Sequence, residues 1–202
     1  HNLVPLFAVT LSFSTTNVTC FGSSDGTATI SASGGTPTYT YLWSDGQTTQ
    51  TAVGLSANQP GVPYSVSITD GSGCTEVFGF DVNEPLPFTI SASITSNYNG
   101  ADISCNGASD GEITIISSGG NGISYYNLNG IILPGSNVQA GLSANTYFID
   151  AYDVLGCSTA DSIVMTEPDL IDPDITITNI SCTGIPDGVI TVNPSGGTTT
   201  GP

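Results

Sequence analysis

The sequence contains no lysine and no arginine, against 17 aspartate and glutamate residues, so its formal net charge at pH 7 is −17. A chain of this length and ordinary composition would carry about 20 cationic side chains. Without cations the chain cannot neutralise a phosphate backbone, which excludes nucleic-acid binding. It also lacks the basic patch that binds anionic lipids and the arginine clamp that serves phosphoryl transfer.

Long apolar runs are missing as well. No segment reaches the ~18 residues of a membrane span, so we expect no direct membrane insertion. Charged residues make up only 8% of the chain, but 38% of the residues are hydrophobic, and the eight Tyr, seven Phe and one Trp argue against disorder. Low charge density with many Ser, Thr, Gly and Asn indicates a folded extracellular β-protein.

Catalytic groups are scarce. The single histidine is residue 1, so a Ser-His-Asp set is not expected, and no Cys-x-x-Cys spacing indicates a zinc site. A pair of carboxylates, as in glycosidases, is the one remaining mechanism, and nothing marks one pair as special. We therefore expect that the protein is not an enzyme.

An internal repeat organises the chain. The motif Cys-x-Gly-x-x-Asp-Gly begins at Cys20, Cys105 and Cys182, and each copy is soon followed by Ser-Gly-Gly. The first two copies then share Gly-Leu-Ser-Ala, a segment that leads into Asp-x-x-Gly-Cys, and a closing Glu-Pro. This period of about 80 residues predicts repeats at 1–84 and 85–167 and the start of a truncated third repeat at 168–202.

The repeat also suggests how the five cysteines pair. We predict one disulfide in each complete repeat, Cys20–Cys74 and Cys105–Cys157, each closing a loop of about 50 residues and adding about 4 kcal/mol in the chain-entropy model. Cys182 matches the first cysteine of a repeat, so we expect its partner beyond residue 202 and an unpaired thiol here. Disulfides indicate an oxidising compartment.

Alternation of apolar and polar residues with period two is found along the chain, and no window shows helical periodicity. The clearest predicted strands lie at 27–32, 38–43, 64–69, 88–95, 111–116 and 175–180. Asp-Gly, Asn-Gly and Gly-Gly pairs are expected to mark hairpins between strands. We therefore predict an all-β fold of tandem immunoglobulin-like antiparallel β-sandwich repeats, each with one disulfide.

The aromatic residues of the first repeat have two interpretations. One face of a predicted strand carries Tyr39, Tyr41 and Trp43, and this arrangement suits either a sugar-binding platform or core packing. Trp43 aligns with Leu128 in the second repeat, and this replacement favours the core. Tyr64 and Tyr147 follow the Gly-Leu-Ser-Ala segments and resemble the tyrosine corner of immunoglobulin-like domains.

Taken together, these motifs and the segment Tyr-x-Tyr-x-Trp-Ser-Asp-Gly at 39–46 resemble the SprB repeat of Bacteroidota cell-surface adhesins. The resemblance covers both complete repeats and the start of the third. It implies a very long extracellular protein at the cell surface, exported by the type IX secretion system. The best-known proteins of this kind are gliding adhesins, so the resemblance also implies gliding or type IX secretion machinery as partners.

Carboxylates at equivalent positions of the two complete repeats are candidate calcium ligands. A chain with a large net charge repels itself, and calcium bridges carboxylate and carbonyl oxygens. Asp-Gly is also a common turn dipeptide, and no EF-hand or nonapeptide loop is present, so turn formation explains the same residues. Both interpretations stay open for Asp25, Asp70 and Glu84 in the first repeat and Asp110, Asp153 and Glu167 in the second.

Three residues are candidate glycosylation sites. Asn17 and Asn179 begin Asn-x-Ser/Thr sequons at equivalent repeat positions. Ser162 lies in Asp-Ser-Ile, which is similar to the O-glycosylation site of Bacteroidota proteins.

These observations predict a repetitive extracellular stalk segment of a bacterial surface adhesin, linked to gliding motility and surface attachment. Its expected partners are an extracellular surface or polysaccharide and the neighbouring repeats of the same chain, since Ser- and Thr-covered faces suit weak multivalent contact. Two alternatives are a passive spacer or filament-forming module and a non-catalytic tether of a secreted enzyme.

Overall fold

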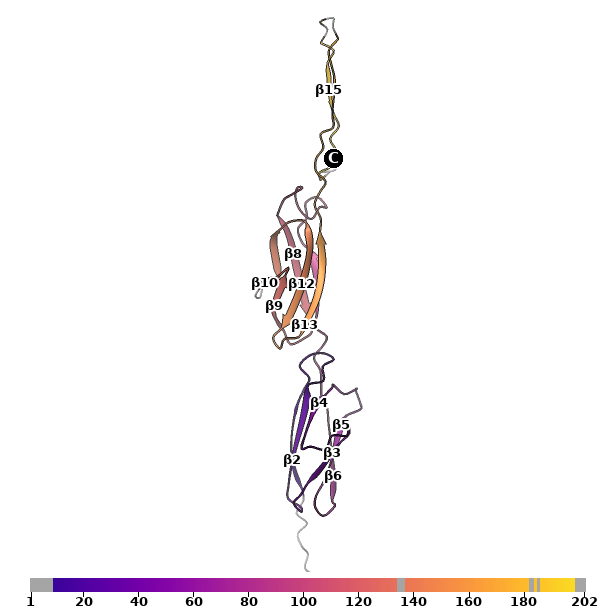
Figure 1. Ribbon diagram of the computed structural model, residues 1–202, viewed down its shortest axis with the longest axis vertical. Helices are drawn as coiled ribbons and strands as arrows, with labels where there is room; N and C mark the ends of the chain where they lie inside the picture. Colours follow the sequence, from indigo (N-terminus) through magenta and orange to yellow (C-terminus); the bar gives the residue numbers. More distant parts are fainter. Residues whose placement is uncertain (1–8, 134–136, 182–183, 185, 199–202) are drawn as a thin grey trace, which may run out of the picture. The chain divides into compact units, whose positions relative to one another are not determined.

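The computed structural model describes residues 9–133, 137–181, 184 and 186–198 and shows strands and loops with no helix in these ranges (Figure 1). The described chain is therefore all-β, as the alternation predicted. It divides into two compact units. Unit 1 comprises His1–Phe88, Ser118–Gly122 and Asp153–Cys157, and unit 2 comprises Thr89–Ser117, Ile123–Tyr152 and Ser158–Pro202.

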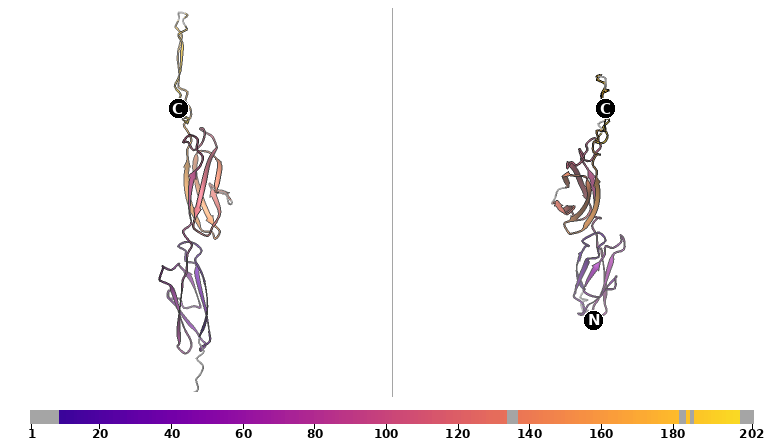
Figure 2. Two further views of the ribbon diagram at one scale, coloured as in Figure 1. Left: turned by 180° about the vertical axis from the view of Figure 1, so that it is seen from behind. Right: turned by 45° about the horizontal axis from the view of Figure 1, so that its top comes forward.

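Unit 1 is a sandwich of two antiparallel sheets, with β2 on one side and β3, β5 and β6 on the other in Figure 1. The first sheet has the order β1 (Thr10–Thr16), β2 (Gly26–Ser33), β4 (Thr51–Leu55). The second has the order β3 (Thr40–Trp43), β5 (Tyr64–Thr69), β6 (Thr75–Phe80). Figure 2 shows the same strands from two further sides.

The core of unit 1 lies between these sheets. Ala28 and Ile30 of β2 are fully buried, and they pack in one cluster with residues of β5 such as Val66 and Ile68. Trp43 is 3% exposed, its indole Nε1 donates to the carbonyl oxygen of Thr49 at 2.7 Å, and its counterpart Leu128 is also buried. The core interpretation of this strand is thus confirmed.

The path of the chain through unit 1 decides where its loops lie. β4 is antiparallel to β2, and β3 is antiparallel to β5. The Thr36 N–H donates to Asp70, which brings the ends of β2 and β5 together and shows that these two strands are parallel. Their partners β4 and β3 therefore run in the same direction as each other. The Asp45-Gly46 turn therefore carries the chain from one sheet to the other without reversing it. The chain therefore runs the length of the sandwich three times in succession. It runs along β2, back along β3 and β4 together, and forward again along β5.

Unit 2 contains a second pair of antiparallel sheets. One has the order β11 (Val138–Leu142), β8 (Gly111–Ser118), β7 (Thr89–Ile94), and the other has the order β10 (Ile131–Leu133), β9 (Ile123–Leu128), β12 (Asn145–Asp153), β13 (Ser158–Met165). Ile113, Ile115 and Ile149 are fully buried. The Tyr147 hydroxyl donates to the carbonyl oxygen of Ser143 at 2.9 Å, which is the upstream backbone bond expected of a tyrosine corner.

The third repeat begins with an antiparallel hairpin of β14 (Ile175–Thr178) and β15 (Val189–Val192). It corresponds to β1 with β2 in the first repeat. Every residue of β14 and β15 is exposed, because the hairpin stands without a facing sheet among the described residues. Cys182 lies outside the described residues, so its expected unpaired state stays a prediction.

Candidate functional site

The disulfide of this structure joins Cys20 to Cys157, with the two Cα atoms 5.7 Å apart and a sequence separation of 137. The predicted pairings Cys20–Cys74 and Cys105–Cys157 are therefore wrong. Cys74 and Cys105 are exposed free thiols. The bridge connects the Cys-x-Gly-x-x-Asp-Gly loop of the first repeat to the Asp-x-x-Gly-Cys turn of the second.

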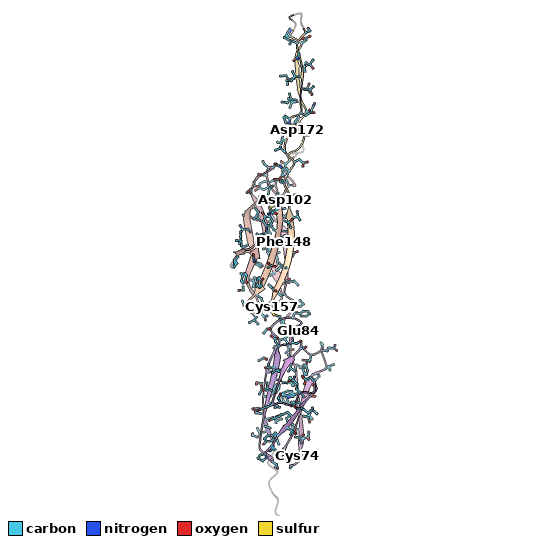
Figure 3. The ribbon with its side chains drawn as sticks, viewed as in Figure 1. Cys74, Glu84, Asp102, Phe148, Cys157 and Asp172 are labelled. Carbon is cyan, nitrogen blue, oxygen red and sulfur yellow. A yellow bond between two sulfur atoms is a disulfide. The ribbon has the colours of Figure 1, made fainter. Side chains whose placement is uncertain are left out.

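The strand path explains why Cys20 does not pair with Cys74. Cys20 precedes the start of β2, whereas the turn of Cys74 contacts the loop after the end of β2, because the backbone N–H of Thr36 donates to Asp70 at 3.0 Å. The eight residues of β2 span about 26 Å. A disulfide needs Cα atoms within ~7 Å of each other. Figure 3 shows Cys74 and Cys157 at opposite ends of unit 1.

We call the surroundings of the bridge the Cys20–Cys157 joint. It consists of residues 19–25, the connecting segment 84–88, Ser118–Gly122 and Asp153–Cys157, all of which belong to unit 1. Hydrogen bonds from backbone or side-chain groups connect these four segments with one another.

Asp153 shapes the turn that delivers Cys157. Its side chain is 2% exposed, and its Oδ1 accepts the backbone N–H groups of Leu155 at 2.9 Å and Cys157 at 2.8 Å. Its Oδ2 accepts the backbone and side-chain N–H groups of Asn121, both at 2.9 Å. Burial acts to raise the pKa of Asp153, but these hydrogen bonds outweigh it and lower the pKa below its ordinary value.

Asp70 occupies the equivalent position of the first repeat. Its carboxylate accepts the N–H groups of Thr36, Ser72 and Cys74 and the Ser72 hydroxyl. The hydrogen bond from Thr36 is the largest influence and, with those from Ser72 and Cys74, lowers the pKa of Asp70 to about 2. Both carboxylates therefore stay charged in the fold through N–H and O–H donors rather than through cations.

Asn121 ties the turn to the loop of the first repeat. Its Nδ2 donates to the carbonyl oxygen of Thr19 and to Asp153 Oδ2, each at 2.9 Å. The sequence reasoning missed this residue. Asn121 follows Ser-Gly-Gly where the first repeat has Thr36, and this replacement by a side chain with two donors was the one available signal.

The segment between the repeats completes the joint. Glu84 Oε2 accepts the backbone N–H of Gly22 at 2.8 Å, and the N–H of Gly120 donates to the carbonyl oxygen of Leu86 at 2.9 Å. At Gly119, φ is +71°, and a Cβ atom would lie 1.9 Å from the carbonyl oxygen of Pro87. Glycine is required there both by the left-handed conformation and by the close approach of two backbones.

The carboxylate of each Asp-Gly pair stabilises its own loop. Asp25 accepts the backbone N–H of Thr19 at 3.0 Å and the Thr19 hydroxyl, and the hydroxyl bond is the main cause of its lowered pKa. Asp110 accepts the N–H of Ser104 in the same way, with a lowered pKa whose main cause is the Ser104 side chain.

The candidate calcium ligands do not assemble as one set. Asp25 and Glu84 bind the Cys20 loop, but Asp70 lies with the turn of Cys74 beyond the other end of β2. Within the described ranges no group of three or more His, Cys, Asp or Glu side chains has the arrangement of a metal site. Glu167 and Asp153 in the second repeat are likewise engaged by backbone N–H donors.

The candidate glycosylation sites are exposed at three separate places. Ser162 lies on β13, Asn17 follows β1, and Asn179 follows β14. The Asn17 Oδ1 accepts the backbone N–H of Asn83 at 3.0 Å. In the part of the chain that the structure describes, no helix is long and apolar enough to cross a membrane.

The fold and the joint define a protein of tandem antiparallel β-sandwich repeats in which a disulfide connects one repeat with the next. The comparison with protein families names these repeats: residues 12–48, 97–131 and 175–202 match the SprB repeat. The chain thus carries SprB repeats, as its motifs predicted. A search of curated proteins found no match.

Proposed function

We propose that this chain is an extracellular stalk segment of a bacterial surface adhesin whose repeats are joined covalently to carry load. The Cys20–Cys157 disulfide is the observation on which this proposal depends. A disulfide is favoured outside the reducing cytosol, and this one bridges two successive repeats rather than closing one. Tension on the chain would follow the bridge and bypass the residues between the two cysteines.

The proposal extends to gliding motility and to export by the type IX secretion system, which the SprB resemblance implies. A moving cell pulls on its adhesins, and a stalk for that purpose needs repeats that do not unravel one by one. The joint meets this need, because the linking segment 84–88 is held by Glu84 and Leu86 as well as bypassed by the bridge.

Non-enzymatic function is part of the same proposal. The carboxylates that recur in both repeats, including the buried Asp70 and Asp153, accept backbone N–H groups of their own turns. Carboxylates engaged in this way stabilise their turns. A general acid or base instead needs access to substrate, so these carboxylates do not suit that role.

Localisation is tested on intact cells of the parent bacterium with an antibody against this segment. Surface labelling that is lost after proteinase K supports the proposal, and trypsin serves as the matched control because the segment has no Lys or Arg to cleave. Labelling only after cell lysis would contradict it.

Adhesion is tested with beads coated by the purified segment on glass and on immobilised extracellular polysaccharide. Binding above that of albumin-coated beads supports a direct contact role for the exposed strands. If the beads do not bind while Cys20→Ser and Cys157→Ser each reduce gliding of intact cells, the segment is a load-bearing spacer and the contact lies elsewhere. If neither substitution alters gliding, the load-bearing proposal fails.

A further inference from the structure

We propose that Cys105 forms a disulfide with the cysteine of the Asp-x-x-Gly-Cys turn in the repeat that follows its own. In this arrangement the repeats are not closed by disulfides of their own but are linked each to the next. The inference rests on the observed bridge and its surroundings, and it does not require that the protein be an adhesin.

The loop around Cys105 has the same internal supports as the loop around Cys20, which is bonded in this structure. Asp110 accepts the N–H of Ser104 at 3.1 Å, as Asp25 accepts that of Thr19 at 3.0 Å. The N–H of Gly107 donates to Glu167 at 2.8 Å, as that of Gly22 donates to Glu84 at 2.8 Å. The Cys105 loop is therefore preformed for the same partner that the Cys20 loop has.

The Ser-Gly-Gly loop of the third repeat contacts its own linking segment as the loop of the second repeat does. The N–H of Gly197 donates to the carbonyl oxygen of Asp169 at 2.8 Å, as the N–H of Gly120 donates to that of Leu86 at 2.9 Å. A Cβ atom on Gly196 would lie 2.2 Å from the carbonyl oxygen of Leu170, which repeats the close approach of Gly119 to the linking segment. In the second repeat, the equivalent Ser-Gly-Gly loop leads to Asn121, whose N–H groups bind the Asp153 turn.

Cys74 is the other half of the same interaction. Asp70 holds the Cys74 N–H at 2.9 Å and the Thr36 N–H at 3.0 Å, as Asp153 holds the turn of Cys157 and the N–H of Asn121. Cys74 is nevertheless an exposed thiol. By the same argument, Cys74 forms a disulfide with the cysteine of the Cys-x-Gly-x-x-Asp-Gly loop in a repeat that precedes the first one.

Formation of the bond is a two-electron oxidation. The Cys105 thiol and the incoming thiol lose two protons and two electrons as the S–S bond forms. A disulfide oxidant, such as oxidised glutathione in the assay, accepts them and is released as two thiols. The neighbouring repeat raises the local concentration of the incoming thiol, because the linking segment holds the two repeats together.

The test uses the full chain with residues 85–167 inserted a second time after Glu167, so that a complete repeat follows Cys105. Serine replaces Cys74, Cys182 and the extra copy of Cys105, which leaves Cys20, Cys105, Cys157 and the extra copy of Cys157. After oxidation in glutathione buffer and alkylation without reduction, we expect no alkylated cysteine. Chymotryptic mapping should then find Cys105 bonded to a Cys157 peptide.

The matched control replaces only the extra copy of Cys157 by serine. We expect Cys105 to become alkylated while the bond of Cys20 to the original Cys157 persists. Circular dichroism of both variants checks that the β-fold is retained, and Cys105→Ser in the first variant provides a second folded reference.

Two results would overturn the inference. One is alkylation of Cys105 in the first variant despite the retained fold. The other is a control variant in which Cys105 takes the original Cys157 and Cys20 becomes alkylated, since pairing would then occur within a repeat. Failure of the adhesion proposal leaves these outcomes unchanged, because the assay reads only the cysteine pairing.

Discussion

The disulfide predicts how the chain extends when it is pulled from residues 1 and 202. Because the bridge spans 137 residues, tension passes through Cys20 and Cys157 and does not reach the segment between them. At about 3.5 Å per extended residue, that segment hides about 480 Å of length. About 65 residues remain outside the bridge, which limits extension of the oxidised chain to about 230 Å.

The assay is single-molecule force spectroscopy with handles at the two ends, first without and then with a thiol reductant. We expect an additional extension of about 480 Å after reduction, since the bridge is then cleaved and the segment enters the force path. Cys20→Ser should give the full extension without reductant. Cys105→Ser is the matched control and should leave the oxidised trace unchanged, because Cys105 is a free thiol in this chain.

The refuting result is equally specific. If each complete repeat were closed by its own disulfide, reduction would release two separate lengths of about 180 Å, one for each loop of about 50 residues. Cys105→Ser would then release one of these lengths in the oxidised chain. Either observation would show that the bridge between the repeats does not carry the load.

Three further predictions concern the turns. Asp70 has a pKa lowered to about 2 in the fold, so its contribution to stability is present above about pH 4 and is lost as pH falls towards 2. The Asp70→Asn variant should therefore be less stable than the unmodified chain at pH 7, and its stability should depend less on pH over that acidic range. Thermal melts of the two proteins measure both differences. Gly119→Ala should reduce the free energy of unfolding by more than Gly22→Ala, for which we expect about 1–2 kcal/mol, because both have φ above +70° but only Gly119 faces the carbonyl oxygen of Pro87; urea unfolding of the two variants measures the difference. A calcium chelator should leave the Tm unchanged, since the candidate ligands already accept backbone N–H groups, and a fall in Tm that added calcium reverses would instead establish a calcium site.

The fold was predictable because its determinants are local. Alternation in β2 places Ala28 and Ile30 inwards and threonine hydroxyls outwards, and any antiparallel sheet with one buried face requires this pattern. The burial of this position was also predictable, because the replacement of Trp43 by Leu128 between the repeats is typical of a core position. Both side chains are buried in the structure. Such inferences need only neighbouring residues and a comparison of the two repeats.

The disulfide could not be predicted in the same way, because it depends on how many times the chain crosses the sandwich. Asp45-Gly46 has the composition of a hairpin, but it moves the chain to the other sheet without reversal, and so the number of crossings between Cys20 and Cys74 is odd. An even number would have returned Cys74 to the end where Cys20 lies. Composition specifies that a turn occurs at this point and does not specify whether the chain reverses.

The missing cations also explain why the recurring carboxylates are where they are. A buried charge is costly unless it is paired or hydrogen-bonded, and this chain has no lysine or arginine to pair with. Asp70 and Asp153 are buried nonetheless, each accepting N–H groups from its own turn and from the residue after Ser-Gly-Gly. A carboxylate with several such donors keeps its charge without a counterion. The recurrence of these residues therefore follows from the construction of the turn that presents each second cysteine.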